Sequence, residues 1–280
     1  MRIELVAADE YTIEELADIY NQTRVDYLIP MAMSAGRLAE YVHDFDVDLA
    51  CSSVARTGDG QVLGLIMLAV RQNLAWVTRL GVLPVIHRNG TGALLLDGLL
   101  DIAGRMGLEE THLEVIQNNT PAYRLFLSRG FRESGEYLVM RRAPKAVAEP
   151  MPAGVEWLDK DQALAVLQGY PHHLTWIVAY ASMRNAANLQ GLRIELPDGG
   201  AGWLVYRLNR FLLSHLVLHT ERGDPLEVGS GLLAYLYTRY PRHDTYAENI
   251  FAGDIHLPAL QAMGYFENFR RIEMRCLPLH

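Results

Sequence analysis

Cysteine is scarce in this chain, and long apolar runs are absent. Cys51 and Cys276 lie far apart without the spacing of a metal site, so we expect two reduced thiols with structural roles. No run approaches the ~18 apolar residues of a membrane helix, which argues against a spanning segment. The sequence begins with an acidic stretch and lacks the basic-then-apolar order of a signal peptide. We therefore expect a cytoplasmic protein without a membrane partner.

Basic residues are outnumbered as well. Lysine and arginine total 25 against 33 aspartate and glutamate residues, a formal net charge of −8. Nucleic acids and anionic membranes bind basic surfaces, so this balance argues against both as partners. Two well-known phosphate loops, GxxxxGKS/T and GxGxxG, are missing. His172 and His173 have no further ligands at useful spacing, so we expect no metal site.

The chain does have length, apolar content and one proline-rich segment. Its 280 residues, half of them apolar, can bury the core of one large domain or of two ordinary ones. The segment 143–154, "APKAVAEPMPAG", holds three prolines and no apolar periodicity, which is typical of a linker. We therefore predict a domain over residues 1–142, a linker over 143–154 and a second domain over 155–280.

Strand and helix patterns alternate along the first domain. Helical spacing of apolar residues predicts one helix over 12–28 and a shorter one over 34–45. Strands are expected at 2–7, 49–57, 61–72, 74–84, 111–117 and 136–142. The turn "GDG" joins the second and third of these as an antiparallel pair. This order predicts an α/β (α+β) fold, with a mixed, mostly antiparallel twisted sheet flanked by helices.

Two further helices follow the fourth and fifth predicted strands. Apolar side chains recur at helical spacing from Leu95 to Met106, and Gly107 marks the C-terminal end. Thr120 is the expected N-cap of the next helix, with Pro121 at its first position.

A basic, glycine-containing loop lies between the fourth strand and its helix. Gly90 and Gly92 have no Cβ, so the backbone can approach an anion closely and reach positive φ. The first turn of the helix leaves N–H groups without intrahelical partners, and these favour a phosphate or pyrophosphate. His87 and Arg88 add positive charge. Turn glycines without a ligand would also explain the pattern.

The wider order of elements resembles the GNAT family of acetyl-CoA-dependent N-acyltransferases. In that family a strand ending in V-x-P precedes Q/R-x-x-G-x-G/A, and N-x-x-A-x-x-x-Y-x-x-x-G-F follows the fifth strand. The corresponding residues here are Val82-Leu83-Pro84, His87-Arg88-Asn89-Gly90-Thr91-Gly92, Asn119-Thr120-Pro121-Ala122, Phe126 and Gly130-Phe131. The resemblance covers roughly residues 2–142. It implies acetyl-CoA as co-substrate, held by Leu80, Val82, His87, Arg88, Asn89, Gly90, Thr91, Gly92, Ala93, Asn119 and Phe126.

The resemblance also implies a mechanism, with two departures. Backbone groups near Leu80 and Val82 would bind the pantetheine arm where the fourth strand bulges, and Gly81 suits such a bulge. His87 stands where glutamine or arginine is usual. Phe126 stands where the family places a tyrosine acid, and a phenyl ring donates no proton.

Three residues are candidates for the catalytic acid and base. Tyr123 lies one helical turn before Phe126 and could act as the acid, although a packed aromatic residue is the simpler interpretation. His112 and Glu114 share a face of the fifth strand, so either could be the general base. Both are also compatible with the polar surface of a sheet.

The second domain resembles the first at a fixed offset. Sliding the chain by 134 residues places "LFLSRGFRESGEYLVMRR" over "ALQAMGYFENFRRIEMRC" without gaps. This indicates an internal repeat and a second GNAT-like unit. At this offset Gly90 meets Asp224 and Gly92 meets Leu226, which would hinder anion binding, so we expect a degenerate unit.

These observations predict an acyl-CoA-dependent N-acyltransferase that acts on a small amine-bearing acceptor. The alternative is a non-catalytic protein that binds acyl-CoA as a sensor or scaffold. The chain could be a monomer with pseudo-dimeric units or a homodimer. The apolar stretch "DYLIPMAMSAG" is expected to border the acceptor site.

Overall fold

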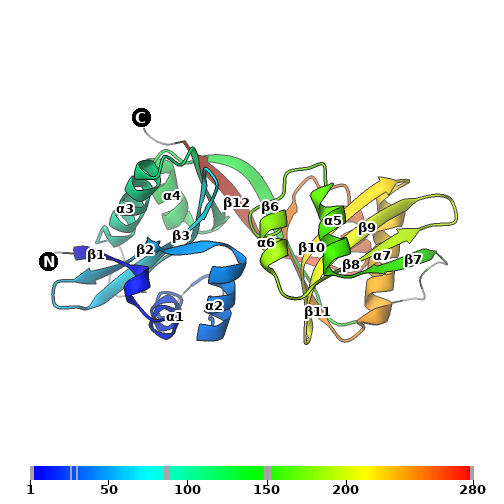
Figure 1. The fold of residues 1–280 in the computed structure, drawn as a ribbon, viewed down its shortest axis with the longest axis horizontal. Coiled ribbons are helices and arrows are strands. Elements are labelled where there is room, and N and C mark those ends of the chain that lie inside the picture. Colours follow the sequence, from blue (N-terminus) through cyan, green and yellow to red (C-terminus); the bar gives the residue numbers. More distant parts are fainter. Residues whose placement is uncertain are drawn as a thin grey trace. The chain divides into compact units, whose positions relative to one another are not determined.

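The computed structural model describes residues 3–25, 27–29, 31–84, 89–147, 150 and 153–277. It divides into two compact units (Figure 1). Unit 1 comprises Met1–Gly135 and Ile272–His280, and unit 2 comprises Glu136–Arg271. Among the helices of the described residues, none is both long and apolar enough to cross a bilayer.

Unit 1 is a sheet with helices on both faces (Figure 1). Its elements are β1 (Ile3–Ala7), the 3₁₀ turn η1 (Ala8–Glu10), α1 (Ile13–Gln22), α2 (Ala35–Asp44), β2 (Val47–Thr57), β3 (Val62–Arg71), β4 (Leu74–Val82), α3 (Thr91–Arg105), β5 (Glu110–Ile116) and α4 (Thr120–Ser128). The strand order is β1-β2-β3-β4-β5-β12, where β12 (Phe266–Cys276) is the last strand of the chain. Pairing is antiparallel from β1 to β4 and parallel between β4 and β5.

Local capping explains where the helices of unit 1 begin and end. Thr12 and Glu15 form a reciprocal capping box at the start of α1. This helix ends at Gln22 rather than continuing to residue 28 as the sequence suggested. The Thr23 hydroxyl donates to the Tyr20 carbonyl oxygen at 2.7 Å, a local bond that competes with helix continuation.

The N-cap of α4 also differs from the prediction. It is Asn119, not Thr120, and its side chain accepts from the Ala122 amide at 3.4 Å. Pro121 has no N–H to donate at the second helical position, so the first amide that a capping side chain can reach is that of Ala122.

Unit 2 repeats the element order of unit 1. It contains the C-terminal part of β6 (Arg132–Arg142), then β7 (Gly154–Leu158), α5 (Lys160–Gln168), α6 (Tyr180–Asn185), β8 (Leu189–Glu195), β9 (Ala201–Asn209), β10 (Leu212–Arg222), α7 (Pro225–Arg239), β11 (Asp244–Phe251), α8 (Leu257–Ala262) and the first part of β12. The strand order is β6-β11-β10-β9-β8-β7. Helices α3 and α7 differ by 134 positions at both ends, as do β6 and β12. The predicted fold class, a mixed and mostly antiparallel sheet flanked by helices, is confirmed.

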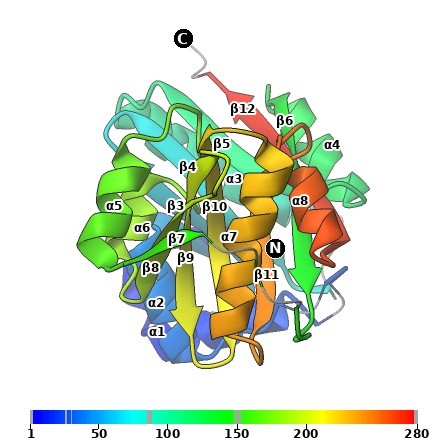
Figure 2. The ribbon, with the colours of Figure 1, turned by 90° about the vertical axis from the view of Figure 1, so that its right-hand side faces the viewer.

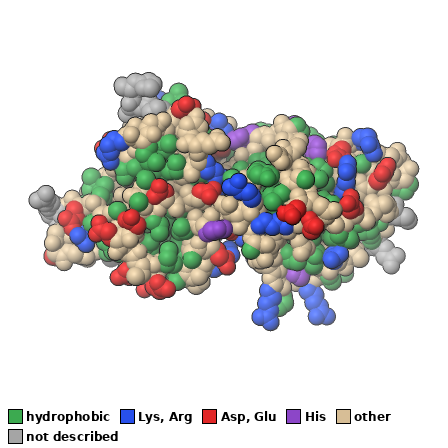
Figure 3. Space-filling view, viewed as in Figure 1, with side chains coloured by type: hydrophobic (Ala, Val, Ile, Leu, Met, Phe, Trp, Pro, Cys, Tyr) green, Lys and Arg blue, Asp and Glu red, His purple; other side chains and the backbone are tan. Residues whose placement is uncertain are grey.

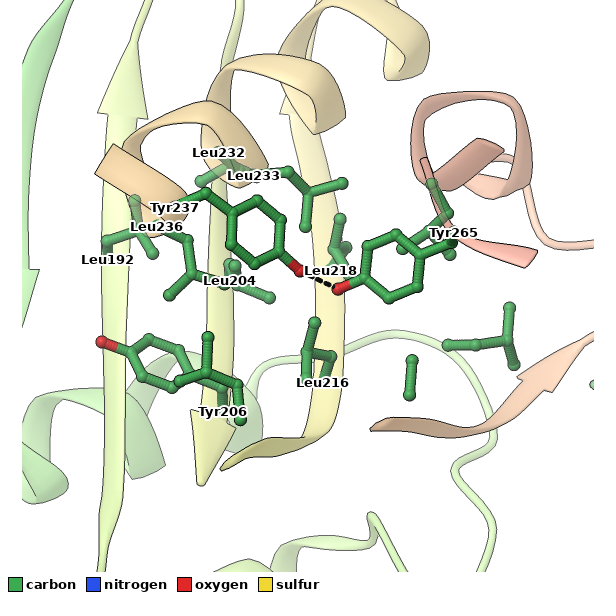
Figure 4. Close-up of a cluster of buried hydrophobic side chains, with 14 of the residues drawn as sticks. Leu192, Leu204, Tyr206, Leu216, Leu218, Leu232, Leu233, Leu236, Tyr237 and Tyr265 are labelled. Atoms are coloured by element: carbon green, nitrogen blue, oxygen red, sulfur yellow. Dashed lines mark hydrogen bonds between the residues drawn. The ribbon is translucent and has the colours of Figure 1, made fainter. Parts of the chain in front are cut away.

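Each unit has its own hydrophobic core. In unit 1, α3 buries Leu95, Leu96 and Leu99 against the sheet. In unit 2, α7 lies against β9 and β10 (Figure 2). It buries Leu232, Leu233, Leu236 and Tyr237 there (Figure 4). Tyr237 and Tyr265 join their buried hydroxyls in a hydrogen bond, which satisfies two polar groups that burial would otherwise penalise (Figure 4).

The division between the units lies inside two strands. Unit 2 begins at Glu136 within β6, ahead of the proline-rich segment 143–154 that the sequence suggested as a linker. Residues 272–276, at the end of β12, belong to unit 1 again. Within unit 1 the Ser134 hydroxyl donates to the Glu273 carboxylate at 2.7 Å. Composition marks a linker, but pairing between strands distant in sequence decides which unit a strand completes.

Candidate active site

The strands β4 and β5 separate part-way along their length. Their parallel pairing ends at Val77 and Leu113, although β4 continues to Val82 and β5 to Ile116. The register between β3 and β4 shifts at the same level, because Met67 pairs with Arg79 and Leu68 pairs with Val77. Thr78 is therefore the extra residue of a β-bulge, which bends the strand. The result is a gap between the two strands beyond Val77.

The sequence analysis placed this bulge at Gly81, and that prediction is wrong. Gly81 pairs in regular register with Leu65. A Cβ at Gly81 would lie 2.3 Å from the Thr23 hydroxyl oxygen, so glycine is required here by the close approach of the chain after α1. The bulge instead occurs where β4 leaves β5, three residues earlier.

At the end of β4, every second residue directs its backbone N–H and C=O groups into the gap. The Leu83 amide donates to the Leu63 carbonyl of the β3 side at 2.9 Å. Because hydrogen-bonding direction alternates along an antiparallel strand, the backbone groups of Leu80 and Val82 point away from β3 and toward the gap. Arg24 donates to the Leu80 carbonyl at 3.2 Å, so this oxygen is already engaged.

The helix α3 begins beside this gap. Gly90 is its N-cap, with φ of 87°, a left-handed conformation that glycine adopts without strain. The Asn89 side chain accepts from the Thr91 amide at 3.1 Å and from the Thr91 hydroxyl at 2.7 Å. The amides of Gly92 and Ala93 remain in the first turn, where no intrahelical acceptor reaches them.

The predicted loop also contains two basic residues and a second glycine. His87 and Arg88 lie outside the described residues. A Cβ at Gly92 would make only ordinary contacts, 3.6 Å from the side chains of Val82 and Leu125. The left-handed backbone at position 90 therefore favours glycine, whereas the fold accepts a side chain at Gly92.

The helix α4 contributes Asn119 at its start and two aromatic residues. Asn119 donates to the Tyr27 hydroxyl at 3.4 Å. Phe126 is buried and packs edge-to-face on Phe131, with ring centroids 5.8 Å apart, so it belongs to the core of unit 1. The Tyr123 hydroxyl donates to the Glu133 carboxylate, and this bond raises the Tyr123 pKa. Its proton is thus directed at a carboxylate within the unit.

The two candidate bases lie on one face of β5. The His112 side chain is only 12% exposed, and its Nε2 lies 3.1 Å from a Glu110 carboxylate oxygen. Burial lowers the His112 pKa, although the Glu110 charge opposes that shift. Glu114 is half-buried two residues further along. Burial therefore keeps His112 neutral and able to accept a proton near pH 7.

Sequence reasoning missed a group of aromatic and basic side chains beside the gap. The Arg79 guanidinium lies 4.2 Å from the ring centroid of Tyr41, and that of Arg24 lies 4.2 Å from the ring of Tyr27. The Tyr20 hydroxyl is buried without a hydrogen-bond partner in the described part of the chain. Burial raises the Tyr41 pKa. Arg79 is the single charged residue on β4, and this could have marked it as a candidate site residue in the sequence. Only the bulge shows which way the Arg79 side chain points.

The corresponding helix start in unit 2 is chemically different. Asp224 is the N-cap of α7, and its carboxylate accepts from the Leu226 amide at 2.8 Å. Glu227 adds a second carboxylate in the first turn. Two negative charges at a helix N-terminus repel a phosphate there. In the described residues, no group of three or more potential ligands is arranged to hold a metal ion.

Comparison with known proteins gives the family of the first unit. The model of the acetyltransferase (GNAT) family matches residues 13–131. These residues form a GNAT domain. A mycothiol acetyltransferase of Clavibacter michiganensis subsp. michiganensis is 35% identical over 111 residues, 40% of this chain and 36% of that relative. The corresponding protein of Clavibacter sepedonicus matches with the same identity and coverage. The chain thus spans little more than a third of the curated relatives it matches.

Solved structures similar to the whole chain extend the GNAT fold to both units. A tandem GNAT protein from the clavulanic acid biosynthesis pathway has a TM-score of 0.67 at 16% identity, covering 100% of this chain and 99% of that one. A GCN5-related N-acetyltransferase from Sphaerobacter thermophilus also has a TM-score of 0.67 at 16% identity, covering 99% and 96%. The resemblance to the GNAT family is confirmed. At these identities the structures establish the fold alone.

Proposed function

We propose that the GNAT domain is an acyl-CoA-dependent N-acyltransferase that transfers an acetyl group to a small amine-bearing acceptor. The observation that supports this most directly is the separation of β4 from β5 beyond Val77 and Leu113, next to the start of α3. A long, thin thioester substrate needs such a slot, with an anion-binding helix start at one end. The names of the two curated relatives support acetyl as the acyl group.

The coenzyme end of the site would use backbone donors. The amides of Gly92 and Ala93, with the dipole of α3, favour the diphosphate, and Asn89, Gly90 and Thr91 shape the turn. We assign His87, Arg88 and Asn119 to the same binding role. The Leu80 amide and the backbone of Val82 would then hydrogen-bond the pantetheine arm, as at a sheet edge, while the Leu80 carbonyl keeps its bond to Arg24.

The chemistry needs a neutral amine, a polarised carbonyl and a departing thiolate. We assign the proton from the amine to His112, which burial keeps neutral, with Glu114 as the competing candidate. The amine nitrogen attacks the thioester carbon, and the bond from carbon to sulfur breaks. A thiolate with a pKa of ~8.5 leaves without obligatory protonation. Tyr123 is therefore a dispensable acid, because its proton is donated to Glu133.

The direct test combines binding and turnover. Isothermal titration calorimetry should detect acetyl-CoA binding, and thiol release should increase with at least one amine from a panel. In Gly92→Glu a carboxylate enters the first turn of α3, so acetyl-CoA binding should be lost while the thermal midpoint stays within a few degrees. Gly104→Glu places the same charge on the exposed face of the same helix and should bind normally. Unchanged affinity in Gly92→Glu refutes the assignment of the loop.

One observation favours a second candidate function. Phe126 is buried in the core, and Tyr123 is bonded to Glu133, so no tyrosine hydroxyl on α4 is directed at a leaving sulfur in the described structure. An acyl-CoA-binding sensor without turnover would tolerate this. If coenzyme A stabilises the fold but no amine is acetylated, the sensor is the correct assignment.

A further inference from the structure

Unit 2 contains a cavity that lies wholly within its own residues. It measures about 420 Å³, inside the range of roughly 300–1,000 Å³ typical of small-molecule sites. The lining residues come from β6, from the segment between α5 and α6, from β10 and β11, and from the turn before α8; they include Tyr137, Tyr170, His219, Thr220, Phe251 and Asp254. A narrow apolar extension of about 40 Å³ continues past Leu218 and Ile250.

The cavity occurs where two strands separate. The parallel pairing of β10 and β11 ends at Ser214 and Tyr246, although β10 continues to Arg222 and β11 to Phe251. A register shift follows Ser214. Unit 2 thus keeps an open slot between its fourth and fifth strands, while Asp224 and Glu227 at the start of α7 disfavour a phosphate-bearing occupant. A ligand of another class is required.

A chain of hydrogen bonds sets the polarity of the cavity wall. Asp254 Oδ1 accepts from the His256 amide at 2.7 Å and lies 3.1 Å from His256 Nδ1. The other ring nitrogen, Nε2, lies 2.9 Å from the Thr220 hydroxyl. A carboxylate accepts only, so Nδ1 carries the hydrogen that His256 shares with Asp254. The Thr220 oxygen and Asp254 Oδ2 are then left as acceptors.

The charge and the aromatic walls point the same way. Asp254 is the single carboxylate among the lining residues, and neither lysine nor arginine lines the cavity. Tyr137 and Phe251 stand edge-to-face with centroids 5.9 Å apart, and Tyr170 packs against His219 at 5.4 Å. Aromatic faces attract cations, and the Asp254 carboxylate, only 25% exposed, attracts a positive group into the same cavity.

We propose that this cavity binds a small organic cation, an ammonium group carried on an aromatic or apolar body. The ammonium donates to Asp254 and Thr220, and the body packs between the aromatic rings, with its far end toward the apolar extension. This site belongs to unit 2 alone and does not depend on acyl transfer in the GNAT domain.

The test compares three probes with one skeleton: benzylamine, benzyl alcohol and benzoate. Calorimetry at pH 7.5, on the full chain without coenzyme, should show benzylamine binding at least 10-fold more tightly than the alcohol, with benzoate weakest. In Asp254→Asn this preference should fall at least 10-fold. Asp161→Asn removes the same charge from the exposed first turn of α5 and should bind as the wild type does.

A second variant covers the case in which Asp254→Asn disturbs the His256 bonds. Ile255 lines the cavity and is 58% exposed, so Ile255→Arg introduces a cation without altering a buried contact. It should weaken benzylamine binding at least 10-fold and leave the thermal midpoint unchanged. Equal affinity for all three probes, or benzylamine binding that neither Asp254→Asn nor Ile255→Arg changes, overturns the proposal.

Discussion

Gly81 and Thr23 lie so close together that a single added methyl group would not fit between them. A Cβ at Gly81 would lie 2.3 Å from the Thr23 Oγ1 and 2.7 Å from its Cβ. The Thr23 hydroxyl is itself bonded to the Tyr20 carbonyl, so it cannot rotate away without losing that bond. This contact fixes the end of α1 against β4, beside the gap.

Gly81→Ala should therefore destabilise the protein by about 1–3 kcal/mol, the usual cost of overpacking. Urea denaturation of the full chain, followed by far-UV circular dichroism, measures the change in the free energy of unfolding. Gly104→Ala is the control, because a Cβ there meets nothing and alanine favours a helix by about 1 kcal/mol. Equal stability of Gly81→Ala and the wild type would contradict the described contact.

Asn89→Asp tests the proposed anion site with a minimal change. Asn89 accepts from the Thr91 amide and hydroxyl through Oδ1, and a carboxylate oxygen can accept the same two bonds, so stability should change by less than about 1 kcal/mol. The new charge lies at the first turn of α3, and the affinity for acetyl-CoA should fall at least 10-fold. Asn209→Asp, at the end of β9 in unit 2, makes the same chemical change elsewhere and should leave the affinity intact. Normal coenzyme binding by Asn89→Asp would move the diphosphate away from this turn.

The pH profile of the acyl-transfer rate should have an acidic limb, where the rate falls because His112 becomes protonated. Burial lowers its pKa in the folded state below the ordinary value of ~6.5. The neutral form is therefore favoured by folding, and the unfolded chain binds the extra proton. Its contribution to stability is complete above pH 6.5 and is lost as the pH falls toward the lowered folded pKa.

The same titration should govern turnover. The value of kcat/KM should still be level at pH 6.5 and decline as the pH falls through the lowered pKa of folded His112, which then takes up a proton. His112→Gln should lose activity by about 10²-fold and lose the limb, whereas Glu114→Gln should retain the limb. A limb that persists in His112→Gln would assign the base to Glu114.

Tyr123→Phe should have a small effect on catalysis. Its hydroxyl donates to Glu133 at a solvent-exposed position, so the substitution removes a surface hydrogen bond worth about 1 kcal/mol or less. We expect kcat to fall less than 10-fold, measured as initial rates with the best amine of the panel. A loss of about 10²-fold with unchanged KM would restore Tyr123 as the acid.

Acidity should weaken ligand binding in unit 2. Burial lowers the His219 pKa, with His256 and His172 acting in the same direction and Glu221 opposing them. His172, His173 and His219 line the cavity together with Asp254. As the pH falls below 6.5 toward the lowered His219 pKa, protonation of His219 adds positive charge to the cavity wall, so benzylamine should bind several-fold more weakly. His219→Phe should reduce that pH dependence; tighter binding at pH 5.5 would contradict the charge argument.

Acidic side chains outnumber basic ones in this chain. Acidic side chains are spread over unit 1 among hydrophobic ones in the view of Figure 3, in keeping with the net charge of −8.

The sequence by itself determined the repeating local features. Apolar spacing located α3, and the αL conformation at Gly90 follows from the single residue type that adopts it freely. The offset of 134 residues predicted the matching bounds of α3 and α7. These features depend on neighbours within a few turns or on direct repetition, so they are visible in the linear order.

Only the tertiary structure decided where strands part and which side chains meet. The bulge at Thr78 turns Arg79 toward Tyr41, and no local pattern around residue 78 indicates it. The end of β12 joins unit 1 through pairing with segments more than a hundred residues earlier in the chain. The cavity around Asp254 arises where two strands stop pairing. Such contacts are set by the balance of burial over the whole unit, which a single sequence does not display.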